Sequence, residues 1–140
     1  MAFEIITTTA SSLLKSGVKG AWFFATDEEI KEALDNPNLE SFNLSLSWED
    51  FQYSLIYGEN KATGEDDFNA KCKEHHLFRI AKLVQLIGNG TDLPEIEIDE
   101  DVQGYVTDGN HRLRAYQFLG KSFQVKVNGE PSFISILNRA

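Results

Sequence analysis

The stretch YVTDGNHRLRAYQFLG, residues 105–120, places a polar turn between two segments of different periodicity. The residues before the turn are typical of a short strand, whereas the apolar residues after it recur at helical spacing. We therefore expect a strand over residues 105–107 and a helix over residues 111–119, with Gly120 as its C-cap. The first N–H groups of such a helix lack intrahelical partners, and the helix dipole favours an anion at this end.

Several residues of the turn have side chains or a backbone that suit a phosphate ligand. Gly109 allows close approach of the backbone and a positive φ angle. His111 can donate a hydrogen bond to a phosphate oxygen or relay a proton near neutral pH, and Arg112 offers a planar fork of donors. Asp108 would repel a phosphate unless it holds Mg²⁺ or acts as a general base. The alternative is an ordinary polar helix cap, with Asp108 or Asn110 as the capping residue and the two basic side chains in water.

The segments around the turn predict an α+β fold. An amphipathic helix over about residues 75–87 is followed by the turn GNG, and the segments LPEIEID and SFQVKV alternate as half-buried strands do. The dipeptide NG at residues 128–129 predicts a turn into a last strand, SFISIL.

The N-terminal half gives weaker signals. FEIITT predicts an opening strand, and capping patterns at Thr26 and Ser47 predict two short helices, the second ending near Gly58. Residues 59–71 are polar and are expected to form a loop. We expect one domain over residues 1–140, built on a small mixed sheet with flanking helices.

Charge is distributed unevenly along the chain, whose net charge is −9. Residues 27–104 hold 19 acidic against 6 basic residues, whereas residues 105–140 hold 2 acidic against 5 basic residues. Nucleic-acid affinity depends largely on neutralising phosphates, so binding of nucleotide or DNA is expected only in the basic last part of the chain. The acidic middle is either a solubilising surface or a surface for a basic partner.

Cysteine and histidine usage limits the metal chemistry. Cys72 is the only cysteine, which excludes an intrachain disulfide and a multi-thiolate metal site and fits a cytoplasmic protein. No apolar run approaches the ~20 residues that span a bilayer, so we expect no membrane partner. His75 and His76 are adjacent, and we expect them to point to different sides of a helix and not to share one site.

The motif DGNHRLRAYQFLG, preceded by LPEIEID and by a helix that ends in LVQLIGNG, resembles the core of the ParB/sulfiredoxin superfamily. The resembling core covers about residues 75–128, and residues 1–74 are divergent. Members of this superfamily bind a nucleotide with its phosphates against this loop and helix N-terminus. The resemblance therefore implies a ParB/sulfiredoxin-like domain that binds ATP, ADP or CTP together with Mg²⁺.

The branches of the superfamily imply different chemistry. Partition-type members bind CTP and grip DNA, and this chain shares the glycine and both arginines of their motif. Free-serine kinases carry Asp-Gly-His-His-Arg, from which this chain departs only at Asn110. Sulfiredoxins have their redox cysteine where this chain has Asn110, so the resemblance does not extend to sulfinic-acid reduction. Other members are plasmid-encoded nucleases. The kinases also take an acid from their N-terminal part, for which residues 65–67 are candidates, although such a run is typical of a solvated surface.

Two functional hypotheses follow. The first is a nucleotide-binding protein that performs Mg²⁺-dependent phosphoryl transfer or hydrolysis of a nucleotide or phosphodiester. In it Asp108 and His111 would be catalytic, and Asp108 would also hold the metal. The nucleotide would be bound by Gly109, Asn110, His111, Arg112 and Arg114. Arg114 lies on a different helix face from Arg112, so a salt bridge to the acidic region is its alternative role. The second hypothesis is a catalytically silent acidic protein that binds a basic nucleic-acid-binding partner or imitates DNA.

Overall fold

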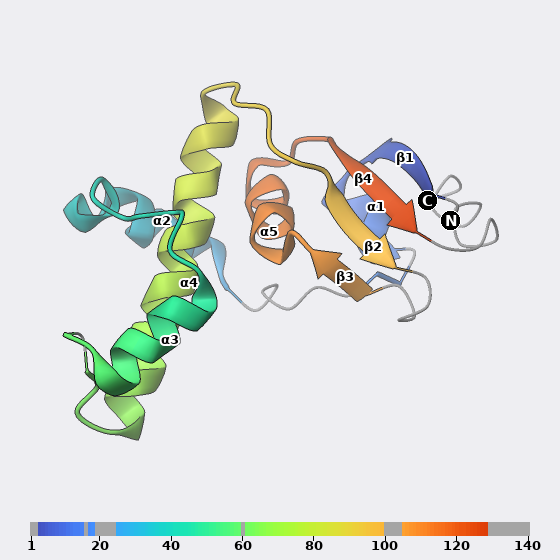
Figure 1. Cartoon of the computed structure of the whole chain (residues 1–140). Coiled ribbons are helices and arrows are strands. Elements are labelled where there is room, and N and C mark those ends of the chain that lie inside the picture. The colour runs from blue at the N-terminus through green and yellow to red at the C-terminus, as the bar shows by residue number, and fades with distance from the viewer. Residues whose placement is uncertain (1–2, 16, 19–24, 60, 100–104, 129–140) are drawn as a thin grey trace. The chain divides into compact units, whose positions relative to one another are not determined.

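The computed structural model describes residues 3–15, 17–18, 25–59, 61–99 and 105–128 (Figure 1). The chain divides into two compact units, one made of Met1–Thr26 with Leu83–Ala140 and the other of Asp27–Lys82. Each unit is described by itself below. The α+β fold class is confirmed, and the single domain expected from the sequence stays a prediction. The expected last strand, SFISIL, lies outside the described residues.

The first unit contains a mixed sheet, whose described strands have the order β1-β4-β2-β3 (Figure 1). The strands are β1 (Phe3–Thr8), β2 (Ile96–Asp99), β3 (Tyr105–Asp108) and β4 (Phe123–Asn128). β4 pairs antiparallel with β1 and parallel with β2, and β2 pairs antiparallel with β3. The alternation read from the sequence is confirmed, because Phe123, Val125 and Val127 of β4 are buried while Gln124 between them is exposed.

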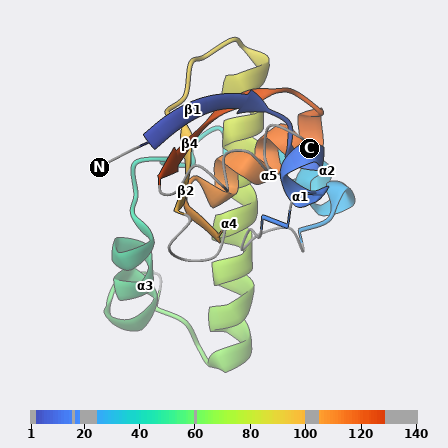
Figure 2. The ribbon, with the colours of Figure 1, turned by 90° about the vertical axis from the view of Figure 1, so that its right-hand side faces the viewer.

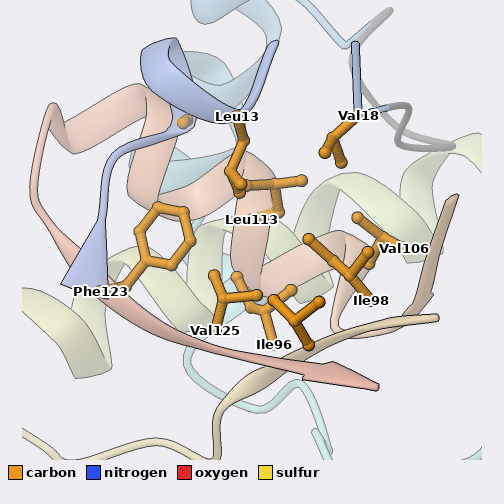
Figure 3. Packing of buried hydrophobic residues seen from close by; sticks show 10 residues of the cluster. Leu13, Val18, Ile96, Ile98, Val106, Leu113, Phe123 and Val125 are labelled. Carbon is orange, nitrogen blue, oxygen red and sulfur yellow. The ribbon is translucent and has the colours of Figure 1, made fainter. Parts of the chain in front are cut away.

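Two helices pack on one face of this sheet, α1 (Ala10–Lys15) and α5 (Asn110–Leu119). Leu13 of α1 and Leu113 of α5 are fully buried and point toward the apolar side chains of the strands (Figure 3). Burial of one such side chain stabilises the fold by about 1.5–3 kcal/mol. The predicted helix over residues 111–119 is thus confirmed, and its apolar residues hold its N-terminus at the end of β3.

The second unit is helical in its described part. It comprises α2 (Asp27–Asp35), the 3-10 helix η1 (Pro37–Leu39), α3 (Trp48–Tyr57) and α4 (Glu65–Gly88) as far as Lys82. The capping pattern at Ser47 is confirmed, because its hydroxyl accepts a hydrogen bond of 3.1 Å from the N–H of Asp50. α3 lies alongside the first half of α4, as two views at right angles show (Figures 1 and 2).

α4 continues from the second unit into the first and carries the periodic apolar face that the sequence predicts. Ile80, Ala81, Val84 and Ile87 are all buried. The turn GNG ends the helix as expected: Gly90 has a φ of 80°, and the N–H of Thr91 donates to the carbonyl of Leu86 over 3.0 Å. None of the described helices has the length and apolar character that crossing a membrane takes.

The loop expected over residues 59–71 is wrong in its second half, because α4 begins at Glu65. The first turns of α4 have no continuous apolar face to reveal them. They are stabilised at their start instead, where a carboxylate oxygen of Asp67 accepts hydrogen bonds from the N–H (3.0 Å) and hydroxyl (3.2 Å) of Thr63. The three acidic side chains in the first turn also stabilise the helix, because they lie at the positive end of the helix dipole.

The expectation that His75 and His76 face different surroundings is also wrong. Both side chains are buried, and both rings contact Trp48, with centroid distances of 5.9 and 4.5 Å. Adjacent residues on a helix differ by about 100° in direction, which still falls within one broad buried face when a second helix packs over it. α3 provides that cover here.

Candidate functional site

The junction between β3 and α5 has the geometry that the motif predicts. β3 ends at Asp108, Gly109 is the N-cap of α5, and the helix begins at Asn110. Gly109 has φ 99° and ψ 25°, a left-handed conformation that a residue with a side chain rarely adopts. A glycine cap contributes no side-chain hydrogen bond to the helix N-terminus. The N-cap residue therefore has no side chain that could occupy the N–H groups of the first turn of α5.

Space as well as conformation requires glycine at this position. A Cβ atom on Gly109 would lie 2.8 Å from the Nη2 atom of Arg112 and 3.1 Å from a side-chain carbon of Ile96. The guanidinium group of Arg112 therefore lies directly against the N-cap residue. An alanine could be accommodated only if Arg112 moved away from the turn.

A backbone contact holds Arg112 in this position. Its Nη2 atom donates a hydrogen bond of 3.2 Å to the carbonyl of Glu95, the residue before β2. A charged donor makes such a bond stronger than one between neutral groups. The contact fixes a cationic group beside the N-terminus of α5, where the helix dipole adds a partial positive charge.

The other residues of the motif differ in what they contact. The side-chain amide of Asn110 donates to the carbonyl of Val106 over 3.3 Å, which closes the turn between β3 and α5. His111 is half-exposed in the first turn of the helix. The backbone of Asp108 pairs with Glu97 at the end of β3, whereas its side chain lies outside the described part of the structure. Its roles as metal ligand and general base stay predictions.

The side chain of Arg114 does not join the residues at the junction of β3 and α5 but contacts the backbone of Ala25. The side chain is 5% exposed, and its Nε and Nη2 atoms both donate to the carbonyl of Ala25, over 2.9 and 2.6 Å. These bonds tie the residues before α2 to the middle of α5. Contact between Arg114 and a nucleotide would require this buried guanidinium group to become accessible. Its roles in nucleotide binding and in a salt bridge to the acidic region stay predictions.

A pocket of about 620 Å³ lies in the same unit, lined by the segment of residues 90–95 and by Tyr116 and Lys121 among others. Glu95 belongs to this lining and also receives the hydrogen bond from Arg112. Burial raises the pKa of the Tyr116 phenol, the positive charge of Arg112 opposes this rise, and Asp92 adds to it. The sequence predicts that Tyr116 faces the core, and its ring does pack against the sheet core, yet it also lines this pocket. Its spacing of four residues from Arg112 places both on one helix face.

Few of the described side chains near this junction could bind a metal ion. Within the residues that the structure describes, no three His, Cys, Asp or Glu side chains come together as a metal site requires. A Mg²⁺ ion at this junction would depend on Asp108 and on oxygen atoms of the ligand itself. Comparisons of the chain with protein-family models, with curated proteins and with solved structures found no match, so interpretation of the junction rests on its own residues.

Proposed function

We propose that the protein binds a nucleotide through its phosphates at the junction of β3 and α5. The observation that carries the proposal is the guanidinium group of Arg112 lying against Gly109, the left-handed N-cap of the helix. A glycine turn, a helix N-terminus and a positioned guanidinium are the elements from which phosphate sites are built. Residues 105–140, with 2 acidic and 5 basic residues, supply the sign of charge that a phosphate needs.

The pocket beside Arg112 supports a ligand larger than phosphate alone. Its volume of about 620 Å³ falls in the range of small-molecule sites. Tyr116 on its wall offers an aromatic ring and a hydroxyl to a base or a sugar. In this arrangement the phosphates bind at Gly109 and Arg112, and the remainder of the nucleotide extends toward the segment of residues 90–95.

The chemistry that we propose is Mg²⁺-dependent phosphoryl transfer or hydrolysis, as the resemblance to the ParB/sulfiredoxin superfamily implies. Asp108 would orient the metal or the nucleophile, and His111 would contact the phosphate or relay a proton. ATP, ADP and CTP are the nucleotides to examine. Asn110 occupies the place of the sulfiredoxin cysteine, so thiol chemistry is not part of the proposal.

Isothermal titration with ATP, ADP and CTP in the presence of Mg²⁺ tests the binding claim. Arg112→Gln should raise the dissociation constant about tenfold or more, because a hydrogen bond to a charged group contributes about 1.5–3 kcal/mol. Lys15→Gln removes one positive charge from an exposed position of α1 in the same unit and should leave affinity nearly unchanged. Thermal melts of both variants separate loss of binding from loss of fold.

Three outcomes would contradict the proposal. They are no heat with any nucleotide, equal affinity in wild type and Arg112→Gln, and equal losses in both variants. Tripolyphosphate is a useful competitor, because it should displace a nucleotide that is held mainly by its phosphates.

A second candidate function is binding of a basic macromolecule by the second unit. Residues 27–82 hold 13 acidic against 6 basic residues, so most of the negative charge of the chain lies in this unit. Anisotropy titration of a labelled polylysine peptide tests it, with reversal of Glu65 and Asp66 to lysine as the perturbation. Asp67 should be left intact, because it stabilises the start of α4 through Thr63. Unchanged affinity after reversal would show that the start of α4 is not the binding surface.

A further inference from the structure

The second unit contains a pocket that the phosphate site does not use. It has a volume of about 330 Å³ and lies between the segment of residues 38–55 and α4. Its apolar walls include the rings of Phe42, Phe51 and Phe78, and His75 lies among them. We call it the His75 pocket. A few polar groups among aromatic walls are the usual composition of a small-molecule site.

His75 is a buried polar group without a hydrogen bond. Its side chain is 3% exposed, and within the described residues neither ring nitrogen has a hydrogen-bond partner. The ring stacks on Phe51 at a centroid distance of 4.1 Å and meets the edge of Phe42 at 5.4 Å. Leaving such a group unsatisfied costs about 1–3 kcal/mol, a cost that a ligand recovers if it supplies the missing hydrogen bond.

The imidazole presents an acceptor at neutral pH. Burial, with a further contribution from the positive charge of Arg79, lowers the pKa of His75 to about 4. A neutral imidazole has one nitrogen that accepts a hydrogen bond and one that donates. The accepting nitrogen is suited to an N–H group of a ligand.

The charge beside His75 indicates the sign of the ligand. Glu74 lines the pocket with an exposed side chain, and among the described residues it forms no ion pair. Lys71, one helical turn earlier on the same wall, places its ammonium group 3.3 Å from the carboxylate of Asp67. The positive charge of Lys71 is thus shared with another acid, and the whole unit is acidic. Arg79, whose positive charge also acts on His75, is not among the lining residues and donates a hydrogen bond to the carbonyl of Leu46. The carboxylate of Glu74 on the pocket wall therefore favours a cation over an anion.

We propose that the His75 pocket binds a small, flat organic cation that carries N–H donors. The flat body packs against the phenyl rings, whose faces attract a cation, and an N–H group donates to His75 while the positive charge lies near Glu74. Both nitrogens of His75 are shielded from water, so binding of the ligand requires the side chains that cover them to move aside. The proposal is independent of nucleotide binding at Gly109.

Three probes of one shape and different charge test the proposal: benzamidinium, benzamide and benzoate. Binding is followed by proton–carbon NMR of the His75 ring in the full chain. Benzamidinium should shift the His75 signals saturably and bind at least about tenfold more tightly than benzoate, with benzamide between them. No saturable shift with benzamidinium, or equal affinity for the cation and the anion, would overturn the proposal.

A pair of matched variants assigns the effect to the pocket. Glu74→Gln removes the carboxylate on the pocket wall, and Glu49→Gln removes one from an exposed position of α3 that does not line the pocket. Only Glu74→Gln should weaken benzamidinium binding, by about fivefold or more. His75→Phe, which keeps a ring in place, should also weaken it. Equal effects of the two glutamate variants would mean that general negative charge, and not the pocket, attracts the probe.

Discussion

Acidification should destabilise the protein through the two buried histidines of α4. His75 and His76 are 3% and 6% exposed, and burial lowers the pKa of each to about 4, with smaller contributions from Arg79 to both and from His75 to His76. The ordinary value of 6.5 applies in the unfolded chain. The folded state therefore favours the neutral rings. The stability that this provides is complete above pH 6.5 and is lost as the pH falls from 6.5 toward 4.

The size of the effect follows from the difference between the two pKa values. At about pH 5 an unfolded histidine is almost fully protonated, whereas the buried ring remains mostly neutral. Each histidine then removes about 2 kcal/mol of stability relative to about pH 7.5, since one pH unit corresponds to about 1.4 kcal/mol. The pair removes about 4 kcal/mol, a large part of the roughly 5–15 kcal/mol that stabilises a typical domain.

Urea unfolding followed by circular dichroism at several pH values measures this loss. The variant His75→Phe keeps an aromatic ring against Phe51 and removes two nitrogens that have no hydrogen bond among the described residues. It should be more stable than wild type by about 1 kcal/mol at pH 7.5 and should lose only about 2 kcal/mol on acidification. His111→Gln leaves both buried rings in place and should keep the full loss. Equal stability of the wild type at the two pH values would refute the reasoning, as would an unchanged pH dependence in His75→Phe.

Three further predictions concern the backbone and the core. Gly109→Ala should lower stability by about 1–3 kcal/mol and abolish nucleotide binding, because alanine is strained at φ 99° and its Cβ would displace Arg112; urea unfolding and titration calorimetry measure the two effects. Leu113→Ala should cost about 2–5 kcal/mol in the same unfolding assay, since Leu113 is fully buried in the sheet core, and a smaller loss would mean that the site collapses around the cavity. Ser47→Ala should cost about 1 kcal/mol by removing the cap of α3, whereas Ser47→Asp should retain most of the stability in a thermal melt; equal melting temperatures for the two variants would contradict the capping role.

Local signals in the sequence predicted the elements around the candidate site. The αL conformation of Gly120, the cap at Ser47 and the alternation in β4 all depend on residues a few positions apart, and each is confirmed. The place of Gly109 between a strand and a helix indicates a positive φ angle, and Gly109 has one.

Contacts between distant residues were not predictable in this way. The burial of His75 and His76 depends on α3 packing over both rings, and the bonds from Arg114 to Ala25 join residues far apart in the chain. Nothing in the spacing of charges indicates that Arg112 bonds to the carbonyl of Glu95 while Arg114 is buried against Ala25. The start of α4 was not predicted for another reason: its first turns are mostly polar and have no continuous apolar face that periodicity could reveal.

The strand order also sets a limit on how the protein can fold during its synthesis. β4 pairs with both β1 and β2, so the sheet has no continuous set of hydrogen bonds until Asn128 has left the ribosome. β1 is synthesised well before β4, its described partner, so Phe3 and Ile5 remain unpaired in the interval. An unpaired strand with exposed apolar side chains is an aggregation hazard. The yield of folded protein should therefore depend on elongation rate and on chaperones that hold the N-terminal segment until β4 arrives.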